Sequence, residues 1–255
     1  MALYLCSLNS GSNGNCYYIG NDHDAVLIDG GISCRETERR MARLGLFLSK
    51  VRAIFISHEH TDHTSGVEVL SRKHRIPVYI THATQENSRL ILDPKLVHRF
   101  SARKPVQIGN LTVHAFLKNH DGIDPHSFTV TFNDTTAGVF TDIGTPCKNL
   151  IHHAGRCHAI FLEANYDETM LENGIYPVYL KRRIRGDDGH LSNLQALEIF
   201  KNHCSPFLKL LVLSHLSAQN NRPQIVYDLF APYANGTRIA LASRYEETEV
   251  FSIMV

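Results

Sequence analysis

Several features that would define a secreted or membrane-bound protein are missing from this chain. No apolar stretch approaches the length that spans a membrane, so we expect no membrane partner. The opening residues, Met1 to Cys6, have neither a basic segment nor a long apolar core, and we therefore predict no signal peptide. None of the 6 cysteines forms a Cys-x-x-Cys pair. We expect free thiols and a cytoplasmic protein.

The sequence also lacks low-complexity segments, charge blocks and linkers rich in proline or glycine. We therefore predict a single domain over residues 1–255, which is long enough to bury a large core. The 26 basic and 25 acidic side chains nearly cancel, so net charge neither requires nor excludes a polyanionic partner. Histidine is abundant, with 16 copies.

Short apolar runs alternate with helical patterns, which is typical of an α/β protein. A hairpin is expected from residues 17–19 and 25–29, and helices from 36–44 and 66–74. Four apolar runs end abruptly in polar side chains: 51–56 before His58, 137–140 before Asp142, 159–162 before Glu163, and 208–213 before His215. Strands that present polar groups at their carboxyl ends can build one site from distant segments.

The densest group of polar side chains is His58-Glu59-His60-Thr61-Asp62-His63, directly after a buried strand. Alternate side chains of an extended chain point the same way, so His58, His60 and Asp62 can converge on one point. His63 opens the following helix and faces a second point nearby. Imidazole and carboxylate groups at this spacing predict a site for two metal ions.

Two ions need more ligands than this motif supplies, and the candidates are His120, Asp142 and His215, which lie at or shortly after the ends of predicted strands. We predict two ligand sets bridged by Asp142: His58, His60 and His120 for one ion, and Asp62, His63 and His215 for the other. A carboxylate can bridge because each of its two oxygens can bind one ion. Asp121 and His126 are rival ligands.

An Asp after an early strand, His-x-His-x-Asp-His, and then a distal His, Asp and His resemble the metallo-β-lactamase-fold hydrolases. The resemblance implies a four-layer αββα sandwich with the metals at one edge, and it implies that Asp29 braces the metal-binding loop. Lactam-cleaving members most often carry Cys where Asp142 stands. The oxygen ligand here suits two divalent ions, Zn²⁺ or Mn²⁺, and phosphodiester or thioester substrates.

Two further segments, Glu163-Ala164-Asn165 and Gly189-His190-Leu191, resemble the Glu and His pair of ribonuclease Z-type phosphodiesterases. The alkoxide that leaves a phosphodiester needs a proton, which a histidine outside the metal ligands can supply while a carboxylate holds the imidazolium. We predict His190 as general acid and Glu163 as its orienting partner, acting beside Asp142.

Two segments are candidates for contact with phosphate. The cations Lys181, Arg182, Arg183 and Arg185 precede the proposed acid, as phosphate contacts or as a solvated face. The small residues of segment 8–16 would let Ser10, Ser12 and Asn15 approach a phosphate, although such a loop can equally be a plain turn.

Taken together, Ser-Gly-Ser-x-Gly-Asn at 10–15, Leu-Ile-Asp-Gly-Gly at 27–31 and Leu-Ser-His-Leu-Ser at 213–217 resemble the YycJ (WalJ) group. These are bacterial proteins regarded as 5′-to-3′ DNA exonucleases. The resemblance implies a dinuclear phosphodiesterase acting on nucleic acid, DNA rather than RNA. It departs at 118–126, where the ligand choice stays open. The alternatives are a hydrolase of cyclic phosphates, thioesters or lactones, and a metal-stabilised regulatory protein without catalysis.

Overall fold

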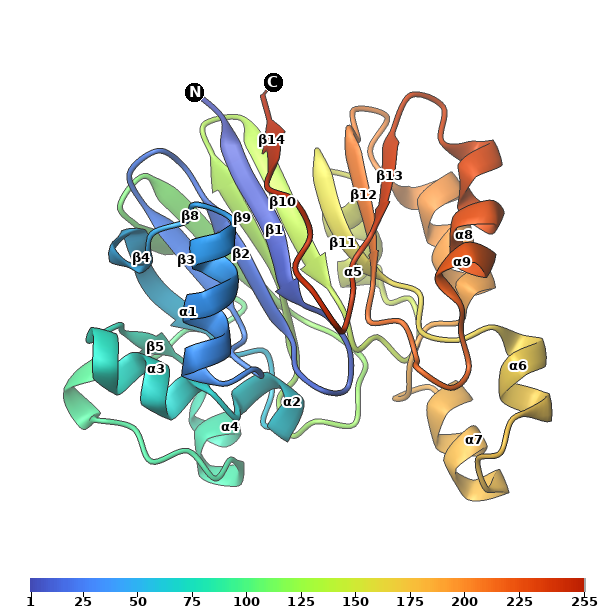
Figure 1. Ribbon diagram of the computed structural model, residues 1–255, viewed down its shortest axis with the longest axis horizontal. Coiled ribbons are helices and arrows are strands. Elements are labelled where there is room, and N and C mark those ends of the chain that lie inside the picture. The colour runs from blue at the N-terminus through green and yellow to red at the C-terminus, as the bar shows by residue number, and fades with distance from the viewer. Residues whose placement is uncertain (255) are drawn as a thin grey trace.

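The apolar runs of the sequence form two seven-stranded sheets that face each other in the computed structural model, which describes residues 1–254 (Figure 1). In spatial order, the first sheet consists of β14 (Phe251–Ile253), β1 (Leu3–Asn9), β2 (Cys16–Gly20), β3 (Ala25–Ile28), β4 (Val51–Phe55), β5 (Val78–Tyr79) and β6 (Val97–His98). The second consists of β13 (Arg238–Leu241), β12 (Leu210–Ser214), β11 (Ala159–Glu163), β10 (Thr135–Phe140), β9 (His126–Phe132), β8 (Leu111–Leu117) and β7 (Val106–Ile108).

Helices cover the outer face of each sheet and decorate one edge of the sandwich (Figure 1). They are α1 (Cys34–Arg43), α2 (Thr61–Thr64), α3 (Val67–His74), α4 (His82–Asn87), α5 (Lys148–Ala154), α6 (Glu168–Asn173), α7 (Val178–Arg185), α8 (Asn193–His203) and α9 (Pro223–Phe230). No helix within residues 1–254 is both long and apolar enough to cross a membrane.

Three apolar layers hold the sandwich together. Strand residues fill most of the central layer, where the centroids of the Tyr17 and Phe161 rings lie 5.0 Å apart between the two sheets. The second layer joins the first sheet to α1 and α3 through Met41 and Leu70, and the third joins the second sheet to α5, α8 and α9. This is the predicted four-layer αββα sandwich.

Parallel pairing brings the polar strand ends to one edge of the molecule. β3 pairs in parallel with β4, and β10, β11 and β12 form a parallel trio, so their carboxyl ends point the same way within each sheet. The expected hairpin is formed by β2 and β3. The helix expected at 36–44 is α1, which begins two residues earlier because the Ser33 side chain accepts a hydrogen bond from the Glu36 N–H.

Replacing Phe161 by alanine tests the central layer. Phe161 is fully buried, so Phe161→Ala should lower the free energy of unfolding by about 3–5 kcal/mol through lost contacts and a cavity. Chemical denaturation monitored by circular dichroism measures the change. The matched control is Phe207→Ala at a residue that is 70% exposed, expected to change stability by less than about 0.5 kcal/mol. Equal losses in the two variants would contradict this account of the core.

Candidate metal centre

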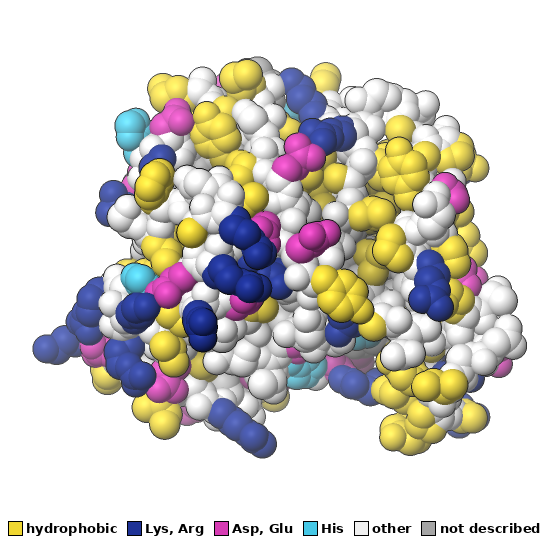
Figure 2. Space-filling view, viewed as in Figure 1, with side chains coloured by type: hydrophobic (Ala, Val, Ile, Leu, Met, Phe, Trp, Pro, Cys, Tyr) yellow, Lys and Arg dark blue, Asp and Glu magenta, His cyan; other side chains and the backbone are white. Residues whose placement is uncertain are grey.

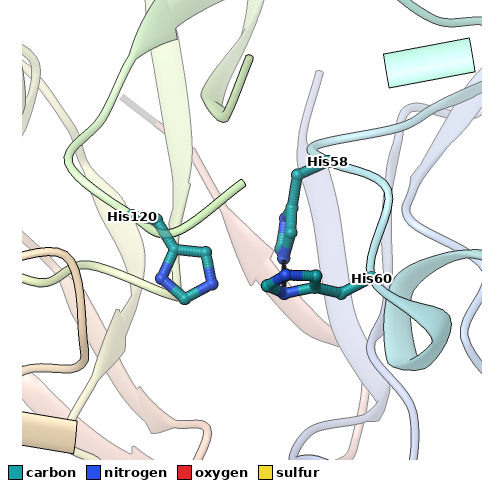
Figure 3. A group of neighbouring side chains, drawn as sticks. All are labelled: His58, His60 and His120. Carbon is teal, nitrogen blue, oxygen red and sulfur yellow. Dashed lines mark hydrogen bonds between the residues drawn. The ribbon is translucent and has the colours of Figure 1, made fainter. Parts of the chain in front are cut away.

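The loop between β4 and α2 supplies the first group of candidate ligands. His58 and His60 project from this loop, and their Nε2 and Nδ1 atoms lie 3.0 Å apart. His120 faces them from the loop that follows β8 in the opposite sheet (Figure 3). One nitrogen of each imidazole lies within 4.8 Å of the others. The structure therefore brings together the three histidines that we predict for the first ion.

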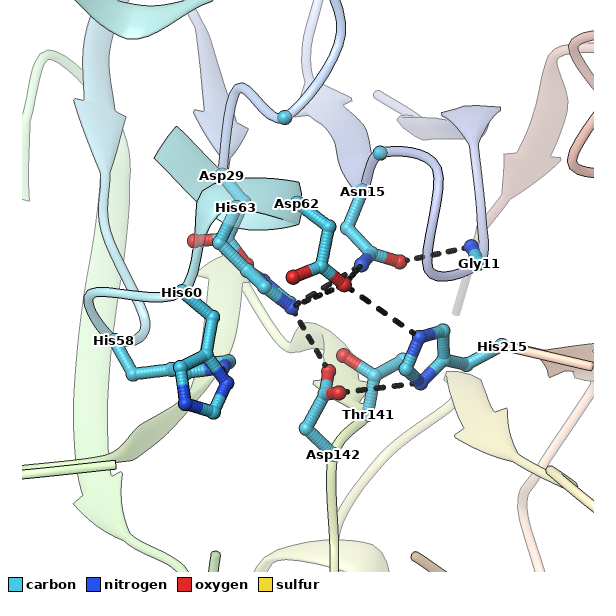
Figure 4. Close-up of polar contacts among 12 residues, drawn as sticks. Gly11, Asn15, Asp29, His58, His60, Asp62, His63, Thr141, Asp142 and His215 are labelled. Atoms are coloured by element: carbon cyan, nitrogen blue, oxygen red, sulfur yellow. Dashed lines mark hydrogen bonds and ion pairs between the residues drawn. The ribbon is translucent and has the colours of Figure 1, made fainter. Parts of the chain in front are cut away.

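The second group gathers around Asp142, which lies two residues after the end of β10 (Figure 4). His63 Nε2 lies 3.3 Å from Asp142 Oδ2, and His215 Nδ1 lies 3.2 Å from Oδ1. Asp62 Oδ2 is 3.5 Å from His63 Nε2 and 4.0 Å from His215 Nε2. His120 Nε2, from the first group, is 3.9 Å from Asp142 Oδ1. Asp142 thus lies between the two groups, the position that a bridging carboxylate needs.

Unsatisfied buried atoms show that this arrangement fits a bound cation. His120 Nε2, Asp142 Oδ2 and His215 Nε2 are buried without a hydrogen-bond partner, although buried polar atoms are usually paired. His120 directs its other nitrogen, Nδ1, to the carbonyl of Gly189 at 3.1 Å, which leaves Nε2 facing the centre. Burial lowers the pKa of His120 to about 3, so its imidazole is neutral, the form in which histidine binds metals.

Four carboxylates lie around the centre. The carboxylates of Asp29, Asp142 and Glu163 are buried, and Asp62 is largely covered. Burial by itself would raise the pKa of Asp142, but the imidazoles of His215 and His63 outweigh burial and hold it well below its usual range. Several buried carboxylates around unpaired imidazole nitrogens form an environment that divalent cations neutralise.

Asp29, at the end of β3, fixes the orientation of the metal-binding loop. Its Oδ1 accepts the Ser57 backbone N–H at 2.8 Å, and its Oδ2 accepts the Ser57 hydroxyl at 2.8 Å. The His63 Nδ1 lies 2.7 Å from the same Oδ2. With Nδ1 held in this way, His63 Nε2 lies toward Asp142, and these contacts are the ones that the predicted bracing by Asp29 requires.

Close backbone contacts lock the loop that follows Asp29 against the loop that carries Asp62. A Cβ atom on Gly31 would lie 1.7 Å from the Asp62 carbonyl oxygen, so only glycine fits at this position. The Asn15 N–H donates to that same carbonyl at 2.7 Å, and the Gly31 N–H donates to the Asn15 carbonyl at 2.8 Å. Three segments distant in sequence therefore define the position of Asp62.

The three small-loop residues that we predict as phosphate contacts take different positions. Asn15 is fully buried, with its Nδ2 3.2 Å from Asp62 Oδ2 and 3.1 Å from His63 Nε2. Ser10 is also buried, and its hydroxyl accepts the His215 backbone N–H at 2.7 Å. Ser12 alone of the three is exposed, and it lines the open pocket beside the centre.

Three residues of the site adopt left-handed backbone conformations at the point where a strand ends. The φ angles are +62° for Asp29, +56° for Asp142 and +55° for His215. Non-glycine residues enter this region at an energetic cost, and such residues concentrate at functional sites. Here the left-handed turn directs each side chain across the end of its sheet and toward the centre.

His190 and Glu163 form a pair beside Asp142. Glu163 Oε1 lies 2.7 Å from His190 Nδ1 and 3.0 Å from His215 Nδ1. Its other oxygen accepts the Ile143 N–H at 2.7 Å. Burial by itself would raise the pKa of Glu163, but the two imidazoles outweigh burial and lower it to about 2. Burial by itself would lower the pKa of His190, but the carboxylate of Glu163 outweighs burial and raises it.

An open pocket of about 620 Å³ extends from the centre along α2 and α4. Its lining includes His60 and Asp62 together with Ser12, Arg89 and Arg183. In Figure 2 histidine side chains are visible at the lower edge of the molecule, in the recess between its two lower projections. His60 and Asp62, two of the candidate ligands, are partly exposed and line this pocket.

The four cations of α7 divide between two flanks of the helix. Arg183 donates to Asp121 Oδ2 at 2.6 Å, beside the centre. The Lys181 ammonium donates to the Glu172 carbonyl, and the Arg185 guanidinium pairs with the Glu172 carboxylate on the other flank. Arg182 is exposed. Of these closely spaced cations, Arg183 therefore lines the pocket, while Lys181 and Arg185 point away from it.

The two rival ligands differ in position. Asp121 Oδ1 lies 3.4 Å from His120 Nε2 and 3.8 Å from His60 Nε2, so it stands at the first ligand group. His126 instead packs its ring against Phe100, with the centroids 5.1 Å apart, and hydrogen-bonds the Asp124 carbonyl.

Lys118 is a residue of the site that the sequence reasoning missed. It is buried, and its ammonium donates to the carbonyl of Thr141, the residue before Asp142, at 2.7 Å. Burial lowers its pKa despite the nearby carboxylates. The available signal was its place after β8, two residues before His120, among the other polar groups that follow strands.

Comparison with known proteins agrees with this geometry. The family model described as the metallo-beta-lactamase superfamily matches residues 10–146, which contain His58, His60, Asp62, His63, His120 and Asp142. The chain belongs to this superfamily. It is a metal-dependent hydrolase, and the fold implies that divalent metal ions are bound at the candidate centre.

Individual members of the superfamily resemble the chain over most of its length. It is 32% identical to "Exodeoxyribonuclease YycJ" of Bacillus anthracis, over 88% of this chain and 86% of that protein. It is 31% identical to "Exodeoxyribonuclease WalJ" of Streptococcus pneumoniae, over 86% of this chain and 84% of that protein. Among solved structures, the metallo-beta-lactamase fold protein YhfI of Bacillus subtilis superposes with a TM-score of 0.77, at 15% identity over 99% of this chain and 100% of that one. The last likeness concerns the fold alone.

Replacing Asp29 by asparagine tests how the metal-binding loop is held. Asparagine accepts a positive φ but removes the charge opposite His63, so Asp29→Asn should weaken divalent-metal affinity by about 10- to 100-fold. Competition with a chelating dye measures the affinity. The control is Asp22→Asn, an exposed residue in the β2–β3 turn, for which no change is expected. Unchanged affinity in Asp29→Asn would contradict the bracing role.

Proposed function

We propose that this protein is a metal-dependent phosphodiesterase that cleaves nucleic acid and acts as a 5′-to-3′ DNA exonuclease with two divalent ions, Zn²⁺ or Mn²⁺. The observation that carries this proposal is the His190–Glu163 pair, with its 2.7 Å contact, beside an all-oxygen-and-nitrogen ligand set centred on Asp142. Cleavage of an unactivated phosphodiester requires a proton donor for the leaving oxygen, which such a pair supplies.

The relatives support the same chemistry. Two proteins that share 31–32% identity with this chain over most of both lengths are called exodeoxyribonucleases. An exodeoxyribonuclease cleaves phosphodiester bonds of DNA from an end. Because the similarity covers more than four fifths of this chain and of each relative, we carry the activity of these relatives to this chain as a proposal.

Seven side chains would hold the two ions: His58, His60 and His120 for one, Asp62, His63 and His215 for the other, and Asp142 for both. When bound, the ions supply Lewis-acid charge to the phosphate and favour deprotonation of the attacking water. Asp29, Asn15 and Lys118 act on the ligands rather than on the substrate, since each contacts a ligand or the backbone next to one.

His190 transfers the proton in this proposal. Glu163 accepts a hydrogen bond from Nδ1 and so favours the imidazolium, in which Nε2 also carries a proton. The rise in the pKa of His190 works in the same direction. Because the His190 side chain is 20% exposed, its ring can reach a substrate that enters from solvent. The proton on Nε2 then passes to the departing sugar oxygen.

The open pocket accommodates the polymer beside the reacting phosphate. Arg183 and Arg89 line it and can meet phosphodiester anions, and Ser12 offers a hydroxyl. Of the proposed phosphate contacts, Arg183 and Ser12 are therefore the ones with direct access to the pocket.

Removal of the proposed general acid gives a sharp test. His190→Ala should slow cleavage of a DNA oligonucleotide by about 10²- to 10⁴-fold. The same variant should lose far less activity on bis(p-nitrophenyl) phosphate, because p-nitrophenolate leaves without a proton. End-labelled single- and double-stranded DNA and RNA measure the first activity, and the direction of the ladder gives the polarity. An equal loss on both substrates would contradict the role of His190.

Replacing the bridging carboxylate separates catalysis from mere binding. Asp142→Ala should abolish cleavage of every phosphodiester, because the two ligand groups then lose the carboxylate that they share. Metal content by elemental analysis accompanies the assay. If the metal-loaded protein leaves all polymers intact while it hydrolyses small phosphodiesters well, the nucleic-acid proposal fails, and a cyclic phosphate, thioester or lactone becomes the substrate class to test.

A further inference from the structure

The segment between Glu163 and His190 projects from the sandwich at the edge that carries the candidate centre. It comprises α6 and α7 (residues 168–185), which we call the α6–α7 hairpin (Figure 1). Three apolar side chains near its tip are strongly exposed: Ile175 by 87%, Val178 by 63% and Tyr179 by 74%. Figure 2 shows apolar surface gathered over this projection at the lower right. Neither folding nor the proposed chemistry uses these side chains.

The hairpin is held by contacts that leave its tip free. Leu180 and Ile184 of α7 pack with Tyr166 and Leu171 in a small apolar cluster. Lys181 and Arg185 bind Glu172 of α6 on one flank of the helix. The hairpin is therefore an ordered element, and the exposed apolar side chains do not result from incomplete packing.

Helix geometry puts Tyr179 on the flank that faces the centre. Residues four apart lie on the same side of a helix, so Tyr179 is aligned with Arg183. Arg183 binds Asp121 at 2.6 Å, and the other oxygen of Asp121 is 3.8 Å from His60 Nε2. Four residues correspond to about 6 Å along the helix axis, so Tyr179 lies one turn further from the centre than Arg183.

We propose that Tyr179 stacks on an unpaired base of the nucleic-acid strand that leads into the centre, while Arg182 and Arg183 contact the phosphates of that strand. The inference rests on the proposed function and adds the form of the substrate, a single-stranded end. An exposed aromatic ring beside cations on one helix flank matches the chemistry of single-stranded nucleic acid, which offers flat bases and regular negative charge.

This pairing of features decides between two possible occupants of the tip. A second protein chain that covered Ile175, Val178 and Tyr179 would also need acidic groups placed to meet Arg182 and Arg183. A single strand uses both the ring and the cations, and it is continuous with the pocket that Arg183 already lines. The single strand is therefore the occupant we test.

Binding of a fluorescein-labelled single-stranded oligonucleotide with uncleavable phosphorothioate linkages tests the proposal in the metal-loaded full chain. Tyr179→Ala should weaken binding by about 5- to 150-fold, the conversion of one base-stacking contact. Tyr179→Phe should bind as the wild type does, because it keeps the ring. The matched control is Phe207→Ala, which removes an exposed aromatic ring before the start of β12, at the opposite end of that strand from His215.

Salt dependence separates the stacking residue from its cationic neighbour. Arg182→Gln should reduce the slope of log affinity against log salt by about one, while Tyr179→Ala should weaken binding without changing that slope. In cleavage assays the loss in Tyr179→Ala should appear in KM, whereas a disturbed metal centre would lower kcat and the metal content.

Three results would overturn the stacking proposal: affinity in Tyr179→Ala equal to that of the wild type, a loss in Tyr179→Phe as large as in Tyr179→Ala, or a change of oligomeric state in Tyr179→Ala during sedimentation. If the wild type cleaves DNA and Tyr179→Ala is unaffected, this inference alone has failed. If the wild type neither binds nor cleaves any polymer, the proposed function has failed as well.

Discussion

Buried negative charge is the constraint on which this structure depends. Taking a carboxylate out of water costs several kcal/mol unless partners replace the lost hydration, yet Asp29, Asp142 and Glu163 are at most 2% exposed. Imidazoles, hydroxyls and backbone N–H groups from other segments point at these carboxylates. These partners do not satisfy every polar atom, because buried nitrogen and oxygen atoms at the centre still have no hydrogen-bond partner. A cation completes the balance, so the fold and the hydrolase chemistry of the superfamily are consequences of the same electrostatic requirement.

The sandwich meets this requirement by bringing strand ends together. The three apolar layers give the scaffold its rigidity. Parallel pairing aligns the carboxyl ends of the strands, where the apolar runs stop. The ligand groups then come from both sheets, with His58 and His63 from one and Asp142 and His215 from the other. Because the ligands come from two different sheets, the packing of the central apolar layer sets the distance between the ligand groups. The tight contact of Gly31 with the Asp62 carbonyl fixes the loop that carries Asp62 within the first half of the sandwich.

Short patterns in the sequence predicted the α/β class and the grouping of the candidate ligands, and the resemblance to the metallo-β-lactamase fold predicted the four-layer sandwich. An apolar run followed by a polar residue is visible in a few letters, and His58 to His63 are contiguous. Features that depend on contacts between distant segments were not predictable in this way. Four closely spaced cations do not reveal that Arg183 faces the pocket while Lys181 and Arg185 face Glu172. That difference depends on the orientation in which α7 packs against α6. Asn15 and Lys118 support ligands from far along the chain, and nothing in their local sequence indicates their partners.

The left-handed backbone at Asp29, Asp142 and His215 has a consequence for how this enzyme can evolve. Asparagine, aspartate, histidine and glycine tolerate that conformation, while β-branched side chains do not. Drift at these three positions is therefore confined to a small alphabet, most of which still offers oxygen or nitrogen to a cation. New specificities are easier to acquire in the α6–α7 hairpin, where no residue has a positive φ and substitutions carry no such backbone penalty. The backbone conformation of a residue therefore limits which substitutions it accepts, in addition to its distance from the substrate.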